Sequence, residues 1–243
     1  MRSLFRKIRE ANRPFCTALV AAAGSSSRMG GVDKLMEFLD NVPVLMRTLT
    51  ALQQADSIDE IVIATRENAL VDISALCKTY GITKCTKVVR GGESRCQSVL
   101  LAALEASPAA KLLAVQDGAR PLVTPELIDD VAEQAARCGA AAPAVAVKDT
   151  IKAVRDDGTV AETLDRAALR AVQTPQIFES ALLKAALQAA VEGGIPITDD
   201  CSAVERLGKR VYLVEGDEEN LKITTPVDLI LAEAILQARE DRI

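Results

Sequence analysis

Apolar segments of two kinds alternate along this chain. Short runs such as Thr17–Ala22 and Leu112–Gln116 are almost continuously apolar, whereas longer segments such as Pro125–Cys138 place apolar residues at helical spacing. A continuous apolar run indicates a strand that is buried on both faces. The repeated strand–helix–strand order therefore predicts an α/β fold with a doubly wound, mostly parallel sheet.

The alternation assigns most segments up to residue 147. The predicted strands are Thr17–Ala22, Ile61–Ala64, Lys87–Val89, Leu112–Gln116 and Ala141–Val147. The predicted helices are Val44–Gln54, Glu67–Tyr80, Ser94–Ala106 and Pro125–Cys138. Ligands bind such sheets beyond the carboxyl ends of the strands. Polar segments at Gly24, Gly91-Gly92 and Asp117 directly follow predicted strands, so we expect them to converge on one site.

The pattern changes after Val147. Lys148–Ala153 and Thr159–Glu162 are predicted to form a hairpin with a turn at Asp156-Asp157-Gly158. The stretch of about residues 148–176 is too small for its own core and is predicted to project as an arm. The chain then returns to the body with a predicted helix at Glu179–Glu192, a strand at Arg210–Glu215 and a helix from Pro226 to about Ala238.

The 243 residues, 49% of them apolar, suffice for one sizeable core. We assign residues 17–238 to a single domain and residues 1–16 to a basic extension. The extension is expected to be frayed or to pack on the domain as a helix, and the alternative is a helix that lies at a membrane interface. Six cysteines without a C-x-x-C pair indicate reduced thiols in a cytoplasmic protein. No uncharged apolar stretch reaches the roughly 18 residues of a membrane span.

The chain has no histidine and only 2% aromatic residues. The lack of histidine excludes Ser-His-Asp triads, Cys-His pairs and H-E-x-x-H zinc sites. The scarcity of aromatic side chains argues against binding nucleic acid by base stacking. Catalysis would depend on arginine, lysine and carboxylates, which suits phosphoryl or nucleotidyl transfer.

The most informative polar segment is Gly24-Ser25-Ser26-Ser27-Arg28, followed by Lys34. Small residues let backbone N–H groups approach an anion, and the two cations can neutralise a polyphosphate. The alternative is a strand-to-helix turn with solvated cations. The spacing differs from G-x-x-x-x-G-K-[ST], and only Gly24 remains of G-x-G-x-x-G. The segment resembles instead the A-A-G-x-G-x-R-M…K signature of nucleotidyltransferases.

Two other segments follow strand ends. The run R-G-G-E-S-R-C-Q-S is either a helix cap, with Glu93 at the positive helix end, or a loop that recognises a base through Gly92 and Ser98. Asp117 either binds Mg²⁺ that bridges phosphates or pairs with Arg120 to stiffen a turn. Taken alone, the motifs K-D-T-I-K, L-D-R and Q-T-P-Q in the predicted arm are typical of a solvated hairpin. The motif T-D-D at residues 198–200 is typical of a helix cap. Lys222, in the motif E-G-D-E-E-N-L-K-I-T, either reaches a phosphate or faces water.

Together and in this order, these segments resemble the 2-C-methyl-D-erythritol 4-phosphate cytidylyltransferases of the non-mevalonate isoprenoid pathway. The resemblance covers about Thr17–Gln237 through the motifs A-A-A-G-S-S-S-R-M, G-G-E-S-R, Q-D-G-A-R-P, K-D-T-I-K, L-D-R, Q-T-P-Q-x-F, T-D-D and E-G-D-x-x-N-x-K-I-T. It implies a Rossmann-like nucleotidyltransferase domain that transfers CMP from CTP to the sugar-alcohol phosphate with Mg²⁺ and releases pyrophosphate. It also implies a homodimer with interlocking arms.

The resemblance implies roles for individual residues. It makes Arg28 and Lys34 transition-state stabilisers, and Arg166 and Lys222 the residues that position the methylerythritol phosphate. The implied CTP contacts are Ala22, Ala23, Gly24, Gly92, Glu93, Ser98 and Gly118. The implied substrate contacts are Asp117, Thr150, Thr174 and Thr198, to which we add Arg120 beside Asp117. Thr150 and Arg166 are expected to come from the partner subunit. The chain departs from the common family pattern at Ala21, Ser26, Glu93 and Gln116.

Three other functions remain open at this point. A ribitol-5-phosphate cytidylyltransferase would share the nucleotide half of the site. A nicotinamide-dependent oxidoreductase would need the missing glycines and an acidic residue at the end of the second strand, which Ile61–Thr65 lacks. A non-catalytic nucleotide-binding module would not need both Arg28 and Lys34.

Overall fold

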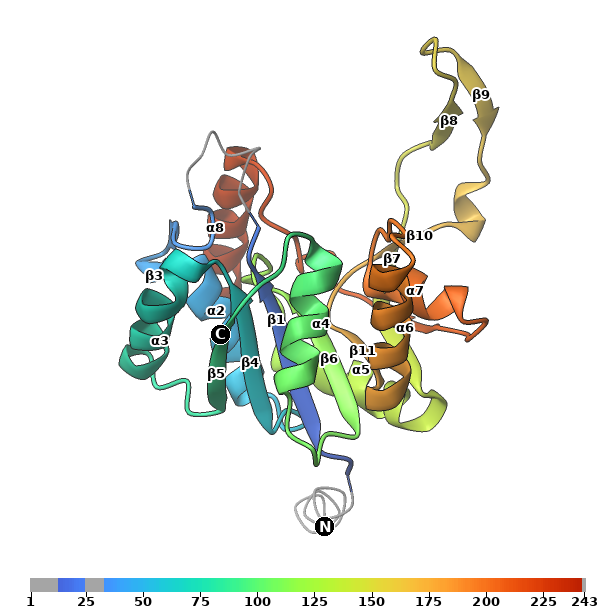
Figure 1. Cartoon of the computed structure of the whole chain (residues 1–243). Coiled ribbons are helices and arrows are strands. Elements are labelled where there is room, and N and C mark those ends of the chain that lie inside the picture. The colour runs from blue at the N-terminus through green and yellow to red at the C-terminus, as the bar shows by residue number, and fades with distance from the viewer. Residues whose placement is uncertain (1–12, 25–32, 242–243) are drawn as a thin grey trace, which may run out of the picture.

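A computed structural model of the 243-residue chain describes residues 13–24 and 33–241 (Figure 1). The strands of its main sheet are β1 (Cys16–Ala22), β4 (Glu60–Thr65), β5 (Cys85–Arg90), β6 (Leu112–Asp117), β7 (Ala140–Ala146), β10 (Arg170–Val172), β11 (Gln176–Glu179) and β12 (Tyr212–Glu215). The α-helices are α2 (Val44–Gln54), α3 (Leu70–Thr79), α4 (Arg95–Glu105), α5 (Pro125–Cys138), α6 (Ser180–Glu192), α7 (Asp200–Arg206) and α8 (Pro226–Glu240). Two short strands, β2 (Phe38–Leu39) and β3 (Val42–Pro43), pair separately before α2.

The strand order β10-β7-β11-β6-β1-β4-β5, with β12 along β7, confirms a mostly parallel sheet. β1 runs parallel to β4 and β6, β4 to β5, and β12 to β7. Within this sheet, the antiparallel pairs of the described strands all involve β10 or β11. The parallel strands β5, β4, β1 and β6 therefore all end at the same edge of the sheet.

The central strands are apolar throughout because the sheet is covered on both faces. In β1, Ala18 and Val20 belong to the core packed by α2, α3, α5 and α8, whereas Leu19 belongs to the core packed by α4, α6 and α7. All three side chains are fully buried. Figure 1 shows the two sets of helices around the sheet, which confirms the doubly wound architecture.

The helix α5 shows how local signals set an element's ends. The Thr124 side chain accepts the Leu127 N–H, and Pro125 occupies the first turn, where no intrahelical N–H bond is lost. Gly139 ends the helix at φ 83°, a conformation that costs glycine little. Both ends match the prediction, as do those of α2. The predicted helix at Glu67–Tyr80 instead begins with a 3₁₀ turn, η2 (Glu67–Ala69), before α3.

The strand β11 and the helix α7 were not predicted from the sequence. The four residues of β11 pair antiparallel between β6 and β7, inside the sheet. Ile177 and Phe178 are fully buried there, but so short a segment carries no clear periodicity. α7 likewise spans only seven residues, and its capping box at Asp199 was recognised only as a possible cap. The segment just before β11 and the first residue of α7 both take part in the site described below.

The hairpin of β8 (Lys152–Val154) and β9 (Val160–Thr163) forms a sheet of its own that stands away from the body (Figure 1). Its predicted turn is present, with Gly158 at φ 82° and the Gly158 N–H donating to Arg155 O over 2.9 Å. Val154 is 67% exposed and Val160 51% exposed. The hairpin therefore presents apolar side chains that this chain does not cover.

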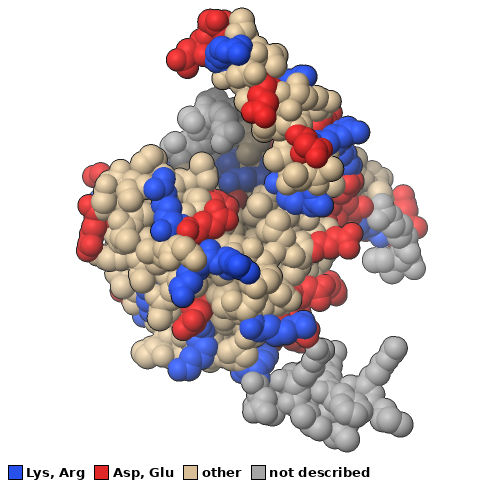
Figure 2. All heavy atoms as spheres, turned by 90° about the vertical axis from the view of Figure 1, so that its right-hand side faces the viewer, with Lys and Arg blue, Asp and Glu red and all other residues tan. Residues whose placement is uncertain are grey.

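The molecular surface carries both signs of charge. Figure 2 shows Lys and Arg side chains interspersed with Asp and Glu over one face, including the projecting hairpin. All six cysteines are free thiols. Among the helices of the described residues, none is long and apolar enough to cross a membrane.

Glu60, at the start of β4, is a buried carboxylate that joins three segments. It accepts hydrogen bonds from Thr17 Oγ1 (2.7 Å), Thr86 Oγ1 (2.8 Å) and the Ser107 N–H (2.7 Å). Burial alone would raise the pKa of Glu60, but these donors outweigh burial and lower it. The ionised carboxylate therefore stabilises the fold.

Replacing Glu60 by glutamine is expected to lower the free energy of unfolding at pH 7 by about 1–3 kcal/mol, because one acceptor oxygen becomes a donor. The folded-state pKa lies below the unfolded value of about 4.3, so this stabilisation is complete above that pH and is lost as the pH falls through the folded-state pKa. Urea denaturation of both proteins should show the difference shrinking on acidification. Glu105→Gln, in an exposed pair with Lys87, should change stability by less than about 1 kcal/mol. A difference for Glu60→Gln that is the same at every pH would contradict the ionised role.

Candidate active site

A cavity of about 340 Å³ opens where β1, β5 and β6 end. Its lining residues are Ala21, Ala23, Gly24, Lys34, Leu35, Gly92, Glu93, Ser94, Arg95, Ser98, Asp117, Gly118, Ala119 and Lys222. The three strand-end segments predicted to converge therefore do so, and Lys222 joins them from a distant loop. This arrangement follows from the parallel register, in which Ala21 of β1 lies beside Asp117 of β6.

The wall formed by β1 and the start of α4 depends on the absence of side chains. A Cβ atom on Gly91 would lie 2.7 Å from Ala23 Cβ and 2.8 Å from Ser98 Oγ. The Gly92 N–H donates to Ser98 Oγ over 3.1 Å, and this hydroxyl donates to Ser94 O over 2.8 Å. The N-terminus of α4, with its partial positive charge, thus borders the cavity.

The charge of the cavity centres on Asp117. Its carboxylate lies 2.7 Å from Lys222 Nζ, 3.5 Å from Arg95 Nη2 and 3.7 Å from Arg120 Nε. Burial would raise the pKa of Asp117, but Arg95, Lys222 and Arg120 outweigh burial and lower it. Asp117 is therefore an anion that holds three cations beside the cavity.

The loop of residues 216–224, which carries Lys222, is held by a buried amide network. Asn220 is fully buried, and its Nδ2 donates to Thr174 O over 3.0 Å. Arg120 Nη1 donates to Asn220 O over 2.5 Å, and Gln173 Nε2 donates to Asp217 O over 2.8 Å. The Asp117 N–H in turn donates to Thr174 Oγ1 over 3.1 Å. Lys222 and Asp117 are therefore positioned by the same short segment before β11.

The structure brings together many of the residues named from the sequence. Those that line the cavity are Ala23, Gly24, Lys34, Gly92, Glu93, Ser98, Asp117, Gly118 and Lys222. Thr174 and Arg120 contact Asp117 from behind it, and the Ala22 side chain is buried outside the lining. Arg28 lies outside the described residues.

Three of the named residues lie elsewhere on the chain. Thr150 and Arg166 flank the hairpin of β8 and β9, where Arg166 Nη1 donates to Lys148 O over 2.8 Å. Thr198 is exposed shortly before α7. None of the three lines the cavity of its own chain.

Sequence reasoning assigned no role to Arg95 and none beyond a cap to Asp200. Arg95 Nη2 lies 2.7 Å from Asp200 Oδ2, and the same guanidinium borders the cavity. The motifs G-G-E-S-R and T-D-D contain these residues, but no spacing along the chain indicates that the two motifs meet. Only the fold, which places the first residue of α7 beside the first residue of α4, shows the pair.

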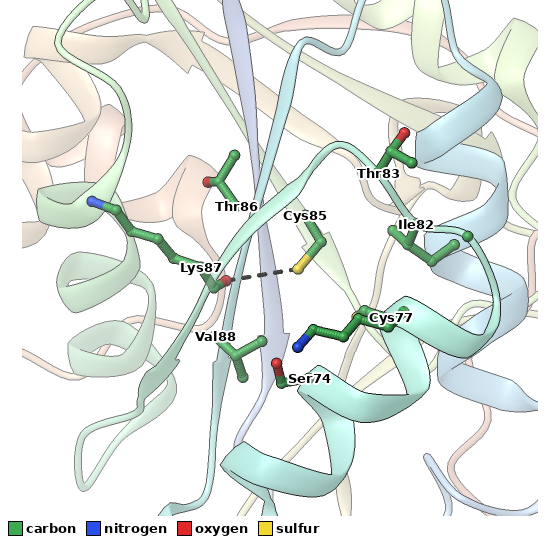
Figure 3. A pocket seen from close by; sticks show the side chains of 10 residues that line it. Ser74, Cys77, Ile82, Thr83, Cys85, Thr86, Lys87 and Val88 are labelled. Atoms are coloured by element: carbon green, nitrogen blue, oxygen red, sulfur yellow. Dashed lines mark hydrogen bonds between the residues drawn. The ribbon is translucent and has the colours of Figure 1, made fainter.

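A second cavity, of about 270 Å³, lies between α3 and the start of β5 (Figure 3). Its lining includes Cys77 and Cys85 but no carboxylate. The Cys85 Sγ donates to Lys87 O over 3.9 Å. This cavity lies beside the first residues of β5, whereas the first cavity lies beyond the strand's last residue. It brings together no comparable set of opposite charges.

Comparisons with known proteins agree with the geometry. Residues 16–238 match the family model of 2-C-methyl-D-erythritol 4-phosphate cytidylyltransferase (IspD). The protein of that name from Bacillus cytotoxicus is 44% identical over 224 residues, which is 92% of this chain and 98% of the relative. The crystal structure of 4-diphosphocytidyl-2C-methyl-D-erythritol synthase from Anaerococcus prevotii superimposes with a TM-score of 0.82 at 29% identity, over 92% of this chain and 96% of that one. For 2-C-methyl-D-erythritol 4-phosphate cytidylyltransferase from Thermus thermophilus the TM-score is 0.75 at 32% identity, over 92% and 99% of the two chains.

Replacing Asp117 by asparagine is expected to lower the free energy of unfolding by about 3 kcal/mol, because Arg95, Arg120 and Lys222 would then repel one another without their shared anion. The Arg95 and Lys222 side chains are partly exposed, so salt should screen part of this repulsion and the loss should be somewhat smaller at high sodium chloride. Urea denaturation at low and high salt measures both effects. Glu133→Gln, which removes an exposed pair with Arg137 on α5, is the matched control. Wild-type stability of Asp117→Asn at low salt would contradict this electrostatic account.

Proposed function

The chain belongs to the 2-C-methyl-D-erythritol 4-phosphate cytidylyltransferase family, and from this premise we propose that the cavity around Asp117 is its active site. The enzyme transfers CMP from CTP to 2-C-methyl-D-erythritol 4-phosphate and releases pyrophosphate. The observation that carries the assignment is the convergence of Lys34, Lys222 and the α4 N-terminus on one cavity at the strand ends. Such a concentration of positive charge suits two phosphorylated substrates.

The chemical step is an in-line displacement at the α-phosphorus of CTP. An oxygen of the substrate phosphate forms the new bond to phosphorus, and the bond to the β-phosphate bridging oxygen breaks. Pyrophosphate leaves with that electron pair. Because the attacking phosphate is already an anion at neutral pH, the step needs no strong general base. This agrees with a chain that contains no histidine.

The nucleotide half of the site is assigned to the segments that follow β1, β5 and β6. Gly92, Glu93 and Ser98 lie at the start of α4, where backbone groups and a carboxylate suit hydrogen bonds to a base edge. Ala23, Gly24 and Gly118 form a wall of small residues that lets phosphates approach the backbone. We assign Ala22 to backbone contact only, because its side chain is buried in the core.

We assign to Lys34 and Arg28 the stabilisation of the negative charge that develops at the α-phosphate. Lys34 lines the cavity, and Arg28 precedes Lys34 in the segment that follows β1. A fixed cation stabilises the transition state more than the ground state when it lies where negative charge accumulates. These two residues therefore act on the reacting phosphorus rather than on the base.

We assign Lys222 to binding the acceptor phosphate and Asp117 to holding Lys222 in place. The 2.7 Å ion pair holds the Lys222 ammonium at the cavity, where it can bind and orient the attacking phosphate. Arg120 and Thr174 act behind Asp117 as its supports. Thr198 lies two residues before α7 and does not line the cavity of its own chain, and we assign it to the acceptor substrate.

Magnesium is the divalent cation that we propose for this site. Glu93 and Asp117 are the carboxylates among the described lining residues, and the described chain offers no cluster of three or more metal-binding side chains. Mg²⁺ is commonly held by one or two carboxylates together with substrate phosphates. Asp117 would hold the ion with the nucleotide, and the ion would offset repulsion between the two substrates.

We further propose a homodimer whose arms exchange. Thr150 and Arg166 lie outside the cavity of their own chain, and the neighbouring hairpin exposes Val154 and Val160. An interface on this hairpin would cover those apolar side chains and bring Thr150 and Arg166 to the partner's acceptor site. Sedimentation of the protein with and without Val154→Asp tests this assignment.

We also propose a cytoplasmic location, because six free thiols are typical of a reducing compartment.

Pyrophosphate release with CTP and Mg²⁺ tests the proposed reaction. We expect release with 2-C-methyl-D-erythritol 4-phosphate and none with ribitol 5-phosphate at the same concentration. Release with ribitol 5-phosphate alone would leave the nucleotide site in place but assign the protein to pentitol metabolism. CTP binding without release from either acceptor would indicate a binding module.

Lys34→Ala is expected to lower kcat by about 100-fold or more, because a charge that stabilises the transition state is lost. Thermal unfolding of the variant, measured in parallel, separates a loss of kcat from a loss of stability. Steady-state pyrophosphate release measures kcat. Lys209→Ala, at an exposed position between α7 and β12, is the control and should keep wild-type turnover. Near-wild-type kcat in Lys34→Ala would overturn the assigned role.

A further inference from the structure

Asp200 is a fully buried carboxylate, and its partner among the ion pairs of the described residues is Arg95. It is the first residue of α7, and the N–H groups of Asp200 and Cys201 both donate to Gln176 Oε1 over 3.0 Å. The backbone is therefore satisfied. Neither carboxylate oxygen has a hydrogen-bond partner among the described residues, and the ion pair with Arg95 at 2.7 Å stands in for one. A buried carboxylate is costly to retain unless it is paired with a cation.

Arg95 lies between two carboxylates that differ in their other cationic partners. Its Nη2 is 2.7 Å from Asp200 and 3.5 Å from Asp117. Asp117 is also paired with Lys222 at 2.7 Å, whereas no other cation is paired with Asp200 in the described part of the chain. Arg95 therefore contacts both carboxylates and lies closer to Asp200 than to Asp117.

The guanidinium of Arg95 is nevertheless open to the cavity. The Arg95 side chain is 32% exposed and belongs to the cavity lining. Both ion pairs use Nη2, and a guanidinium has five N–H donors. A planar cation with spare donors at a cavity wall suits a phosphate group.

We propose that Arg95 is a further nucleotide-binding residue, that its ligand is the triphosphate of CTP, and that Asp200 positions it. This inference rests on the proposed function, which supplies CTP as the ligand. Asp200 anchors Arg95 from the protein side, so less conformational entropy is lost when the anion binds. It also keeps Arg95 from collapsing onto Asp117, whose charge then remains available to Lys222.

The titration of Asp200 agrees with this arrangement. Burial raises the pKa of Asp200 above its ordinary value, and the Arg95 charge acts in the opposite direction. Asp117 and Asp199 add to the upward shift. The ionised form of Asp200 therefore depends on Arg95 remaining in place.

Isothermal titration calorimetry with CTP tests the proposal without requiring turnover. Asp200→Asn should raise the Kd for CTP about tenfold, because the neutral amide no longer anchors the guanidinium. In steady-state assays the KM for CTP should rise, while the KM for the acceptor phosphate should not. A rise confined to the acceptor KM would overturn the assignment to the nucleotide.

A double-mutant cycle separates positioning from a general structural effect. Arg95→Gln should weaken CTP binding at least as much as Asp200→Asn, and adding Asp200→Asn to Arg95→Gln should cause no further loss. Additive losses would show that Asp200 does not act through Arg95 and would overturn the proposal. Asp59→Asn, which breaks the Arg13 ion pair at the opposite end of the sheet, is the matched control and should bind CTP as wild type does.

Arg95→Lys covers the case in which Asp200→Asn fails to fold. It keeps a cation beside Asp200 but removes the planar set of donors, so we expect a folded protein with weaker CTP binding. Wild-type affinity in this variant would overturn the role of Arg95. If the wild type binds CTP but transfers no CMP, the proposed function fails while this inference stands. If the wild type does not bind CTP, both fail.

Discussion

The structure of the site depends on one buried carboxylate, Asp117, and on the charges that must surround it. An unpaired carboxylate in this position would be strongly destabilising. The compensating cations come from three separate parts of the chain: Arg95 from the start of α4, Arg120 from the turn after β6, and Lys222 from the loop before α8. The need to compensate Asp117 therefore brings Arg95 and Lys222 to the cavity, with Arg120 behind it.

The sheet topology makes this convergence possible. Parallel strands end at a common edge, so the segments after β1, β5 and β6 meet without further support. The antiparallel β11 then returns beside β6 and places Thr174 behind Asp117. Asn220 donates a hydrogen bond to the carbonyl of the same Thr174. A strand that interrupts the parallel order is thus what joins the Lys222 loop to the rest of the site.

The sequence predicted those parts of the fold that depend on local signals. The ends of α5 follow from Thr124, Pro125 and Gly139, and the doubly wound sheet follows from strands that are apolar on both faces. The convergence of the strand-end loops follows from general rules for parallel sheets. β11 and α7 could not be recognised in this way, because they are short and owe their burial to tertiary pairing. The Arg95–Asp200 pair was missed for the same reason, since both motifs were visible but their contact depends on how α7 packs.

A crystal structure of the protein with CTP and Mg²⁺ would test the central claim most directly. The account predicts cytidine against Gly92, Glu93 and Ser98, with the triphosphate between Lys34 and Arg95 at the ends of β1 and β6. A nucleotide bound elsewhere, such as in the cavity between α3 and β5, would contradict it. So would a triphosphate in the expected cavity that contacts neither Lys34 nor Arg95.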